Sequence, residues 1–351
     1  MRPIYLRVRY TKRRNSSLGV DDPLKRVAII LLVTAVWLGS LAATTMAAEK
    51  DKVSIVLSWF ATGLNAPHYY AEDLGYYAEE NLEVEVIEGK GSGIAVQMVG
   101  AGTHPFGAAD AAAMAQGVGA GVPVKMVAGL VQKSPVVLLS LPGSGLDTPQ
   151  SLKGKSVVMP PGSGQASLFP VLLAQNGMRP NDVRVVSAEA TTSINLVLEK
   201  KADAVGNYGP TAVAIFENAL GESPTTLYFA DFGVPTLSTG LIVNASYLQK
   251  NPDIVERFVR ATVRGWEAAR ENPRAAAESY VKRFPENDVD MITSMTEGFT
   301  SLMRTPNNEE KPLGWMSTED WQDTLDILVA ANMLPSRSRN LDTYYTNDFV
   351  E

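Results

Sequence analysis

Residues 53–88 constrain the fold more than any other part of the sequence. A mostly apolar run, Val53–Leu57, predicts a strand covered on both faces, and such strands are usually parallel and central. The segment Leu82–Ile87 alternates apolar with acidic residues, which predicts a strand with one wetter face. Between the two, Pro67 can open a helix and Gly75 can end it. The segment therefore predicts a strand–helix–strand unit, and the loop after its first strand sits where open parallel sheets bind ligands.

Strands and helices continue to alternate after residue 88. Two Gly- and Ser-rich loops lead into expected helices. Ser92 is a plausible cap for the first helix, and Ser163 belongs to the second loop, at residues 160–165. Asp110 is expected to cap a further helix. Strand after helix after strand predicts an α/β protein with mostly parallel sheets. Further strands are expected at residues 103–110, 122–131, 157–159, 183–186 and 202–205. The C-terminal part is predicted to be helical and to pack against the first domain, over Pro252–Glu271, Pro273–Phe284, Val289–Met303 and Thr318–Ala331.

The N-terminal 47 residues read as an export signal. The first 26 residues hold eight Lys or Arg residues, and an apolar run from Val27 to about Ala43 follows. Small residues then end the run, and Thr45 with Ala47 fits a cleavage site near Ala47 or Ala48. A retained transmembrane helix is the alternative, although the polar and small residues after Gly39 interrupt an already short span. We expect residues 1–47 to be a cleaved signal peptide.

Charge and cysteine content exclude several classes of function. The chain has 31 basic and 38 acidic residues, and removal of residues 1–47 takes away far more basic than acidic ones. The acidic remainder argues against nucleic acid or an anionic membrane as a partner. With no cysteine, the chain can form no disulfide and carry out no thiol chemistry. The two histidines, His68 and His104, supply too few ligands for a zinc site, and no Gly-x-Ser-x-Gly elbow occurs. We expect no catalytic residue, metal or cofactor.

Several motifs together resemble one family. Ser58-Trp59, the loop Asn65-Ala66-Pro67 and Gly75-Tyr76-Tyr77 look like the opening of the ABC-transporter solute-binding proteins of the sulfonate, nitrate, taurine and thiamine-pyrimidine-precursor type. Later segments resemble the same family, namely Leu82-Glu83-Val84, the Gly-Ala-Ala-Asp run ending at Asp110, Ser151–Lys155, Ala202-Asp203-Ala204 and Tyr345–Phe349. The resemblance covers nearly the whole chain after residue 47.

The resemblance implies the fold and the role of the protein. It implies a two-lobed periplasmic binding protein fold of type II, with mostly parallel sheets flanked by helices and two crossovers between the lobes. Lobe I then comprises residues 48–136 and 236–351, and lobe II comprises residues 137–235. The family role is that of a periplasmic, exported carrier that traps a small solute between its lobes and delivers it to membrane permease subunits served by a separate ATPase. A monomer is expected.

The resemblance leaves the solute open. The opening of the chain is most similar to the branch that includes carriers of pyrimidine thiamine precursors and riboflavin-like molecules. The related fungal pyrimidine synthases have a histidine where this chain has Asn65, and a cysteine-rich run near residues 233–239, and both are absent here. Synthase activity is therefore not expected, although His68 lies close to the first position. An exported enzyme on the same scaffold is the less favoured reading.

Two kinds of pocket compete on physical grounds. In the first, Trp59, Tyr69 and Tyr208 present flat faces to an aromatic or heterocyclic solute, and aromatic pairs add roughly 0.5–1.5 kcal/mol each beyond burial. The edge of that solute is bonded by polar side chains, for which Asn65, Glu189 and Asn207 are the candidates. In the second, helix N-termini after Ser92 and Ser163 hold a small oxyanion such as sulfonate, taurine or nitrate. The remaining candidate ligand contacts are His68, Asp110, Gln165 and Thr236. The aromatic solute is the preferred prediction.

Overall fold

The structure is a computed structural model that describes residues 49–335 and 340–350. The predicted export signal at residues 1–47 lies outside the described residues. Within the described ranges, no helix is long and apolar enough to cross a membrane. The described residues from Lys50 onward form one compact unit, which is built on two five-stranded sheets.

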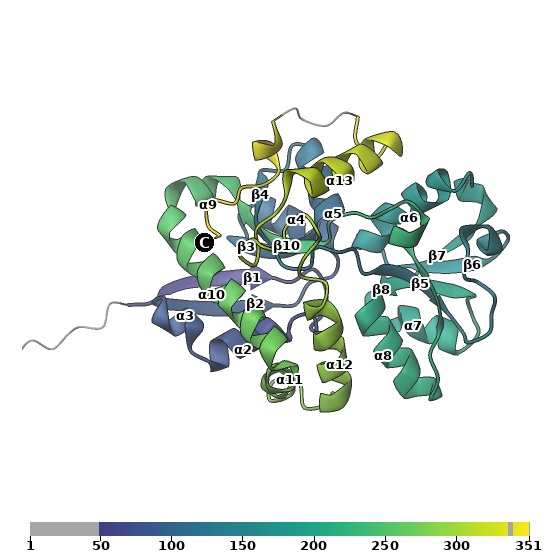
Figure 1. Cartoon of the computed structure of the whole chain (residues 1–351), viewed down its shortest axis with the longest axis horizontal. Coiled ribbons are helices and arrows are strands. Elements are labelled where there is room, and N and C mark those ends of the chain that lie inside the picture. The colour runs from purple at the N-terminus through teal and green to yellow at the C-terminus, as the bar shows by residue number, and fades with distance from the viewer. Residues whose placement is uncertain (1–48, 336–339, 351) are drawn as a thin grey trace, which may run out of the picture. The chain divides into compact units, whose positions relative to one another are not determined.

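The first sheet contains the strand–helix–strand unit that opens the chain (Figure 1). Its strand order is β2-β1-β3-β10-β4, and β1 pairs in parallel with both β2 and β3. β10 is antiparallel to β3 and to β4, so it alone runs against the others. The strands of this sheet are β1 (Asp51–Val56), β2 (Leu82–Ile87), β3 (Phe106–Asp110), β4 (Val124–Gly129) and β10 (Thr239–Asn244).

The second sheet repeats the arrangement of the first. Its order is β7-β6-β8-β5-β9, with β6 parallel to β7 and β8, and β5 antiparallel to β8 and β9. One strand in each sheet opposes the rest, which confirms the prediction of an α/β fold with mostly parallel sheets. The strands of this sheet are β5 (Val136–Ser140), β6 (Ser156–Met159), β7 (Arg184–Ser187), β8 (Ala204–Tyr208) and β9 (Thr225–Tyr228).

The chain crosses between the sheets twice. Residues 130–135 connect β4 to β5, and residues 233–238 connect the 3-10 turn Phe229–Phe232 to β10. The predicted lobe boundaries, at 136/137 and 235/236, fall beside these two connections. Both connections are short and join the same two sheets.

Helices follow the strands at the positions that the turn residues indicate. Asp110 caps α5, since its Oδ1 accepts a hydrogen bond of 2.9 Å from the amide of Ala112, and Ser163 caps α6 by accepting from Ala166 N at 3.2 Å. The helices that follow the two sheets are α2 (Ala66–Asp73), α3 (Tyr76–Glu79), α4 (Ser92–Gly100), α5 (Ala111–Gly119), α6 (Gly164–Gln175), α7 (Ala190–Leu198) and α8 (Gly209–Leu220).

Ser92 does not cap α4, contrary to the prediction. Gly91 holds the cap position, and Ser92 is the first helical residue. The Oγ of Ser92 accepts a hydrogen bond of 3.1 Å from the backbone amide of Asp110 instead. The hydroxyl therefore ties the start of α4 to the end of β3 rather than closing its own helix.

The C-terminal part is helical, as predicted, with one difference in packing. Its helices are α9 (Ala245–Lys250), α10 (Pro252–Glu271), α11 (Pro273–Val281), α12 (Val289–Thr300) and α13 (Thr318–Ala330). α10 and α11 pack against α2, and α13 packs against α5, all in the half built on the first sheet. α12 also contacts α8, which belongs to the second sheet, and a Cβ on Gly298 would lie 2.7 Å from Pro210 Cβ. α12 thus packs against the first half, through α2, α10 and α11 as expected, and against the second half as well.

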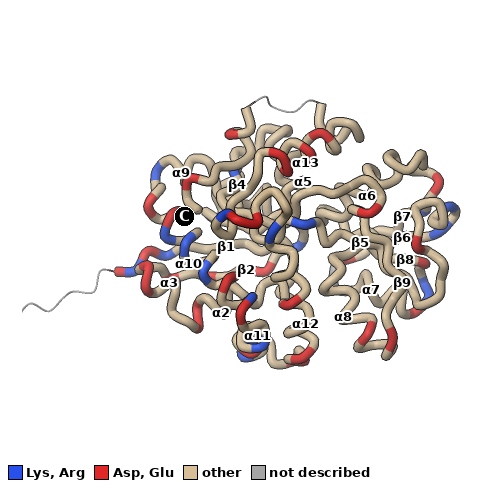
Figure 2. The backbone as a smooth tube through the Cα atoms, viewed as in Figure 1, with Lys and Arg blue, Asp and Glu red and all other residues tan. Residues whose placement is uncertain are grey.

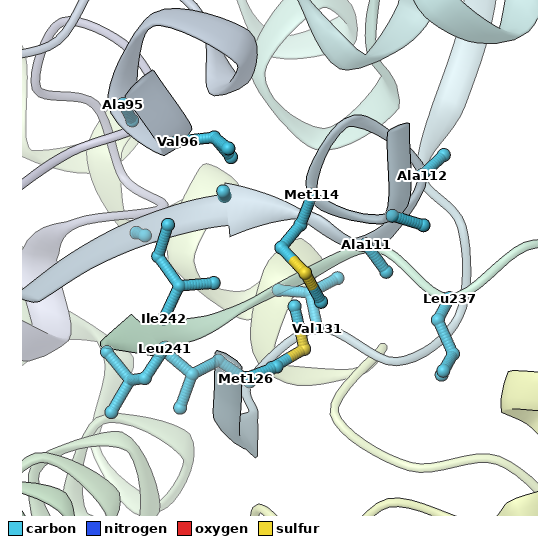
Figure 3. Packing of buried hydrophobic residues seen from close by; sticks show 14 of the residues in the cluster. Ala95, Val96, Ala111, Ala112, Met114, Met126, Val131, Leu237, Leu241 and Ile242 are labelled. Atoms are coloured by element: carbon cyan, nitrogen blue, oxygen red, sulfur yellow. The ribbon is translucent and has the colours of Figure 1, made fainter. Parts of the chain in front are cut away.

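Ion pairs and a shared core hold α10 in place. Arg257 bonds Asp51, Arg260 bonds Glu80 and Arg264 bonds Glu79, at distances of 2.7, 2.7 and 2.9 Å, and Figure 2 shows charges of both signs along α10 and α3. Beneath these ion pairs, buried apolar side chains from both sheets form one continuous cluster. In Figure 3, side chains from α5, β4 and β10 converge on this cluster, among them Met114, Met126 and Ile242. The core thus positions the loops at the strand ends.

Candidate functional site

A small cavity lies where loops from the two sheets meet. Its volume is about 30 Å³, close to the space of a single water molecule. From the first sheet it is lined by the loop after β1 and the start of α4, and from the second sheet by the starts of α6 and α8. The lining residues are Ser58, Trp59, Thr62, Leu64, Ser92, Ser163, Gly164, Gln165, Asn207, Tyr208 and Thr211. We call this space the interlobe cavity.

Direct contacts close the interlobe cavity. The amide of Gly93, in α4, donates a hydrogen bond of 2.9 Å to the carbonyl oxygen of Gly162, in the loop before α6. Gly91 has a φ of +137°, and a Cβ there would lie 2.7 Å from the same carbonyl oxygen. A second contact comes from Gly164, where a Cβ would lie 2.9 Å from the Cβ of Asp110. Glycine at these positions lets the two halves approach, backbone against backbone, so the structure is the closed form.

Asp110 lies behind the cavity wall and holds it together. Its carboxylate is fully buried, and Oδ2 accepts hydrogen bonds of 3.2 Å from Tyr208 Oη and from Ser238 Oγ. Burial raises the pKa of Asp110 to about 6, while the hydrogen bonds from Ala112, Tyr208 and Ser238 act to lower it. Burial, followed by the neighbouring Asp110 carboxylate, raises the pKa of Tyr208, which therefore stays a hydrogen-bond donor. Asp110 is thus a positioning residue for Tyr208.

The cavity lining is polar, aromatic and free of charge. Five Ser and Thr hydroxyls and the amides of Gln165 and Asn207 supply hydrogen-bonding groups, while Trp59 and Tyr208 supply flat aromatic faces. Among the lining residues there is no Lys, Arg, Asp or Glu. Such a lining matches an uncharged planar solute with polar edges, since a buried charge needs a partner of opposite sign. The N-termini of α4 and α6 remain the feature that suits an anion.

The cavity brings together six of the predicted contacts. These are Trp59, Ser92, Ser163, Gln165, Asn207 and Tyr208. Gln165 and Asn207 are held by the backbone, because Gln165 Nε2 donates to Gly206 O at 3.3 Å and Asn207 Oδ1 accepts from Tyr208 N at 2.7 Å. These residues lie at or just after the carboxyl ends of four strands, β1, β2, β6 and β8, as the parallel-sheet rule predicts.

Three predicted contacts in or next to α2 do not line the cavity. Asn65 is buried and accepts a hydrogen bond of 3.2 Å from the amide of Thr62. His68 is also buried, with its ring 6.3 Å from that of Trp266, and burial lowers its pKa to about 4. The ring of Tyr69 packs edge-on against those of Tyr280 and Phe284, in α11 and just after it. The side chains of His68 and Tyr69 thus pack against α10 and α11, and that of Asn65 bonds the turn before α2.

Two further predicted contacts lie elsewhere. Glu189 is exposed at the start of α7 and lines no part of the cavity. Thr236 is buried in the second crossover and lines a different, larger cleft. In the other direction, sequence reasoning missed Ser58, Thr62, Leu64, Gly164 and Thr211, which all line the cavity. Each of them lies within five residues of a predicted contact, so the loops were identified and their individual side chains were not.

The described residues contain no group of three or more His, Asp or Glu side chains placed to bind a metal ion. The lining offers hydrogen-bonding groups and aromatic faces to a small molecule, although the closed cavity of about 30 Å³ is too small to hold one. The two walls of the site, drawn from two similar sheets and closed over one cavity, define the class of two-lobed binding proteins.

Residues 64–276 match the family model described as NMT1/THI5 like, and the chain belongs to this family. It is similar to a formylaminopyrimidine-binding protein of Halalkalibacterium halodurans, with 23% identity over 87% of this chain and 94% of the relative. It is also similar to a riboflavin-binding protein, RibY, of Chloroflexus aurantiacus, with 26% identity over 92% of this chain and 96% of the relative. A third relative, a 4-amino-5-hydroxymethyl-2-methylpyrimidine phosphate synthase of Legionella pneumophila, is 23% identical over 69% of this chain and 76% of its own length.

Solved structures share the fold. The alkanesulfonate-binding protein SsuA of Xanthomonas axonopodis superimposes with a TM-score of 0.66 and 16% identity, covering 86% of this chain and all of that one (100%). A Candida albicans protein described as having the generic periplasmic binding protein fold superimposes with a TM-score of 0.65 and 17% identity, covering 86% of this chain and 98% of that one. The predicted periplasmic binding protein fold is therefore confirmed.

Proposed function

We propose that this chain is the solute-binding component of an ABC importer, exported to the periplasm as a monomer. It encloses a small solute between its two halves and delivers it to membrane permease subunits that a separate ATPase drives. The observation that carries the proposal is the interlobe cavity, whose walls come from both sheets and touch directly. Membership of the NMT1/THI5-like family and the two relatives named as binding proteins support it.

The proposed solute is a planar heterocycle with polar edges. Trp59 and Tyr208 offer aromatic faces, and the lining hydroxyls and amides offer donors and acceptors without charge. The names of the relatives, which refer to a formylaminopyrimidine and to riboflavin, point to the same class of molecule.

A small oxyanion is the second candidate. The starts of α4 and α6 both border the cavity, and helix N-termini attract anions. The structural likeness to an alkanesulfonate-binding protein is consistent with it. No basic side chain lines the cavity, however, so an anion there has only backbone dipoles and hydroxyls as partners. The uncharged heterocycle is therefore preferred.

Solute entry requires the halves to move apart. The interlobe cavity, at about 30 Å³, is roughly ten times smaller than the ~300 Å³ at which small-molecule sites begin. A solute therefore enters an opened cleft, in which the contacts between Gly93 and Gly162 and between Tyr208 and Asp110 are broken. The bond between Tyr208 and Asp110 re-forms when the halves close over the solute and the lining side chains move aside to make room. Rotation at residues 130–135 and 233–238 gives this opening, a hinge motion of the kind common in binding proteins.

We propose binding without chemistry. Coverage does not separate the two cases, since relatives named as synthases cover 69% to 86% of this chain and the two binding proteins cover 87% and 92%. The chain has Asn65, however, where the resembling fungal synthases have a histidine, and it has no cysteine. Incubation of the protein with its solute, followed by mass spectrometry of the released ligand, separates the two cases. Recovery of the solute unchanged from a saturable complex supports a carrier, and a changed product contradicts it.

The test of the proposed function is a melting-temperature screen of the purified protein. Candidate solutes are pyrimidines, flavins, aryl acids and sulfonates. A solute present at about 100 times its dissociation constant stabilises the folded state by roughly 2.7 kcal/mol. We expect a heterocycle to raise the melting temperature of the protein and to raise that of a Trp59→Ala variant by about a third as much. A shift by sulfonates alone supports the oxyanion, and equal shifts in both proteins contradict the cavity as the site.

A further inference from the structure

A second, larger cleft lies at the two crossovers. Its volume is about 730 Å³, within the ~300–1,000 Å³ range typical of small-molecule sites. Its walls come from both crossovers, at residues 132–135 and 235–237, and from α8, α12 and the start of α13. We call it the hinge cleft. It shares no lining residue with the interlobe cavity, so it is a separate site.

Apolar side chains form much of the wall of the hinge cleft. They come from both halves, since Val213 and Ala214 belong to α8 and Leu302 follows α12. Burial of apolar ligand surface against such walls contributes to affinity without any specific polar contact. The apolar lining residues that matter most here are Pro135, Pro210, Val213, Ala214, Leu237 and Leu302.

Two buried hydroxyl groups in this cleft lack partners. Ser134 Oγ and Thr236 Oγ1 are both buried, and neither has a hydrogen-bond partner among the described residues. One hydroxyl lies on each crossover, and both residues line the cleft. Thr236 as a whole is only 2% exposed. Buried hydroxyls are nearly always bonded in folded proteins, and both oxygens are covered in this structure, so a ligand in the cleft reaches them only when the crossovers shift.

The charged residues of the cleft lining indicate which charge a ligand should carry. The lining has three aspartates, Asp231, Asp320 and Asp323, against one lysine, Lys133. Asp320 already accepts hydrogen bonds from Thr305 Oγ1 at 2.6 Å and Asn307 Nδ2 at 2.7 Å. Asp231 and Asp323 have no ion pair or hydrogen bond within the part of the chain that the structure describes. Two free carboxylates beside apolar walls attract a cation.

We propose that the hinge cleft is a second binding site, for a small amphipathic cation: a protonated amine carried on an apolar ring or chain. The apolar part packs between α8 and the segment after α12, the amine faces Asp231 and Asp323, and a polar group reaches the hydroxyls of Ser134 and Thr236. The proposal does not depend on the identity of the solute in the interlobe cavity.

Benzylamine tests this site, with benzyl alcohol and benzoate as probes of the same shape and different charge. Titration of the purified protein, followed by ligand-observed NMR, measures each affinity. We expect benzylamine to bind saturably and at least about tenfold more tightly than benzoate, because the lining carries excess negative charge. Equal affinity of benzylamine and benzoate overturns the proposal.

Variants locate the benzylamine site. Val213→Trp fills the hinge cleft, and Ser294→Trp fills it from an exposed position on α12, where a large side chain does not disturb the core. We expect either variant to remove saturable benzylamine binding, and Asp231→Asn with Asp323→Asn to weaken it by about fivefold or more. Trp59→Ala, in the interlobe cavity, must leave it unchanged. Unaltered binding in Ser294→Trp, or loss of binding in Trp59→Ala, overturns the assignment and leaves the proposed solute function untouched.

Discussion

The phenolic oxygen of Tyr208 donates a hydrogen bond of 3.2 Å to Oδ2 of Asp110. Tyr208 ends β8 in the second sheet, and Asp110 ends β3 in the first. This bond therefore joins the carboxyl ends of two central strands from different sheets. Tyr208 also lines the interlobe cavity, so the same side chain contacts the proposed solute and closes the cleft over it.

Tyr208→Phe keeps the aromatic ring and removes the bond between the halves. We expect the affinity for the solute to fall roughly tenfold, since a hydrogen bond to a charged group contributes about 1.5 kcal/mol or more. Isothermal titration with the solute found in the screen measures the change. Ser238→Ala is the matched control, because it removes the other donor to Asp110 Oδ2 without breaking a contact to the second sheet. Equal losses in the two variants would show that closure does not use the Tyr208 bond.

Trp59→Ala tests the aromatic wall of the cavity. Loss of a large flat side chain from a binding pocket typically costs about 2 kcal/mol or more, or roughly thirtyfold in affinity. We expect the affinity for a heterocyclic solute to fall by this amount while the melting temperature of the free protein stays within a few degrees. Trp315→Ala serves as the control, because Trp315 is also partly exposed and lines none of the cavities described above. Unchanged affinity in a folded Trp59→Ala protein would remove the aromatic wall from the site.

Gly164→Ala places a wedge between the halves. The new Cβ would lie 2.9 Å from Asp110 Cβ and 3.1 Å from Tyr208 Oη, and Asp110 Cβ cannot rotate away. Gly164 begins α6, where alanine itself is well tolerated, so the effect falls on closure rather than on the helix. We expect weaker solute binding and a larger radius of gyration by small-angle X-ray scattering. Ser167→Ala, in the same helix, is the control. A wedge variant as closed as the parent would contradict this reading of the contact.

His68 makes stability depend on pH. Burial lowers the pKa of His68 to about 4 in the folded protein, whereas the unfolded chain has a pKa near 6.5. As the pH falls from about 6.5 to 4, the unfolded chain takes up a proton that the folded protein does not. The free energy of unfolding therefore falls across this window, by up to about 3 kcal/mol.

Denaturant unfolding of the parent and of His68→Gln, at several pH values, isolates this effect. Asp110 acts in the opposite direction over much of the same window, because burial raises its pKa to about 6 and the folded protein takes up its proton first. The difference between parent and variant cancels this contribution. We expect that difference to shrink as the pH falls from 6.5 to 4. A His68→Gln variant whose stability falls with the same slope as that of the parent would exclude the buried imidazole as the origin of the effect.

Much of the fold follows from local patterns. Pro252–Glu271 was predicted with the bounds of α10, because proline starts it and its apolar residues recur at helical spacing. Thr225–Tyr228 was missed because a strand of four residues at a sheet edge carries too few positions to show a period. The short helix α9 was missed although Asn244 gives a cap signal, accepting from Ser246 N and Tyr247 N at 3.0 Å.

The sequence was enough to predict the loops of the site, but not which side chains of α2 point away from it. Parallel strands bring their carboxyl ends to one edge, which is enough to gather Trp59, Ser163 and Tyr208. His68 and Tyr69 are buried against α10 and α11, which follow almost 200 residues later in the chain. No local pattern shows which helix a side chain will meet at that separation. Thr236 was rightly placed near a crossover, and its cleft belongs to the hinge instead of the interlobe cavity.

The first turn of α8 stands between the two cavities. Tyr208 and Thr211 line the interlobe cavity, and Gly209 and Pro210 line the hinge cleft. Ligands that touch opposite sides of one turn are thermodynamically linked whenever the turn moves on closure. By whatever factor an amine in the hinge cleft changes the dissociation constant of the solute, the solute must change that of the amine by the same factor. Two titrations, each in the presence of the other ligand, thus measure a single coupling energy. In a carrier built this way, the affinity for the solute depends on whether an amine occupies the hinge cleft.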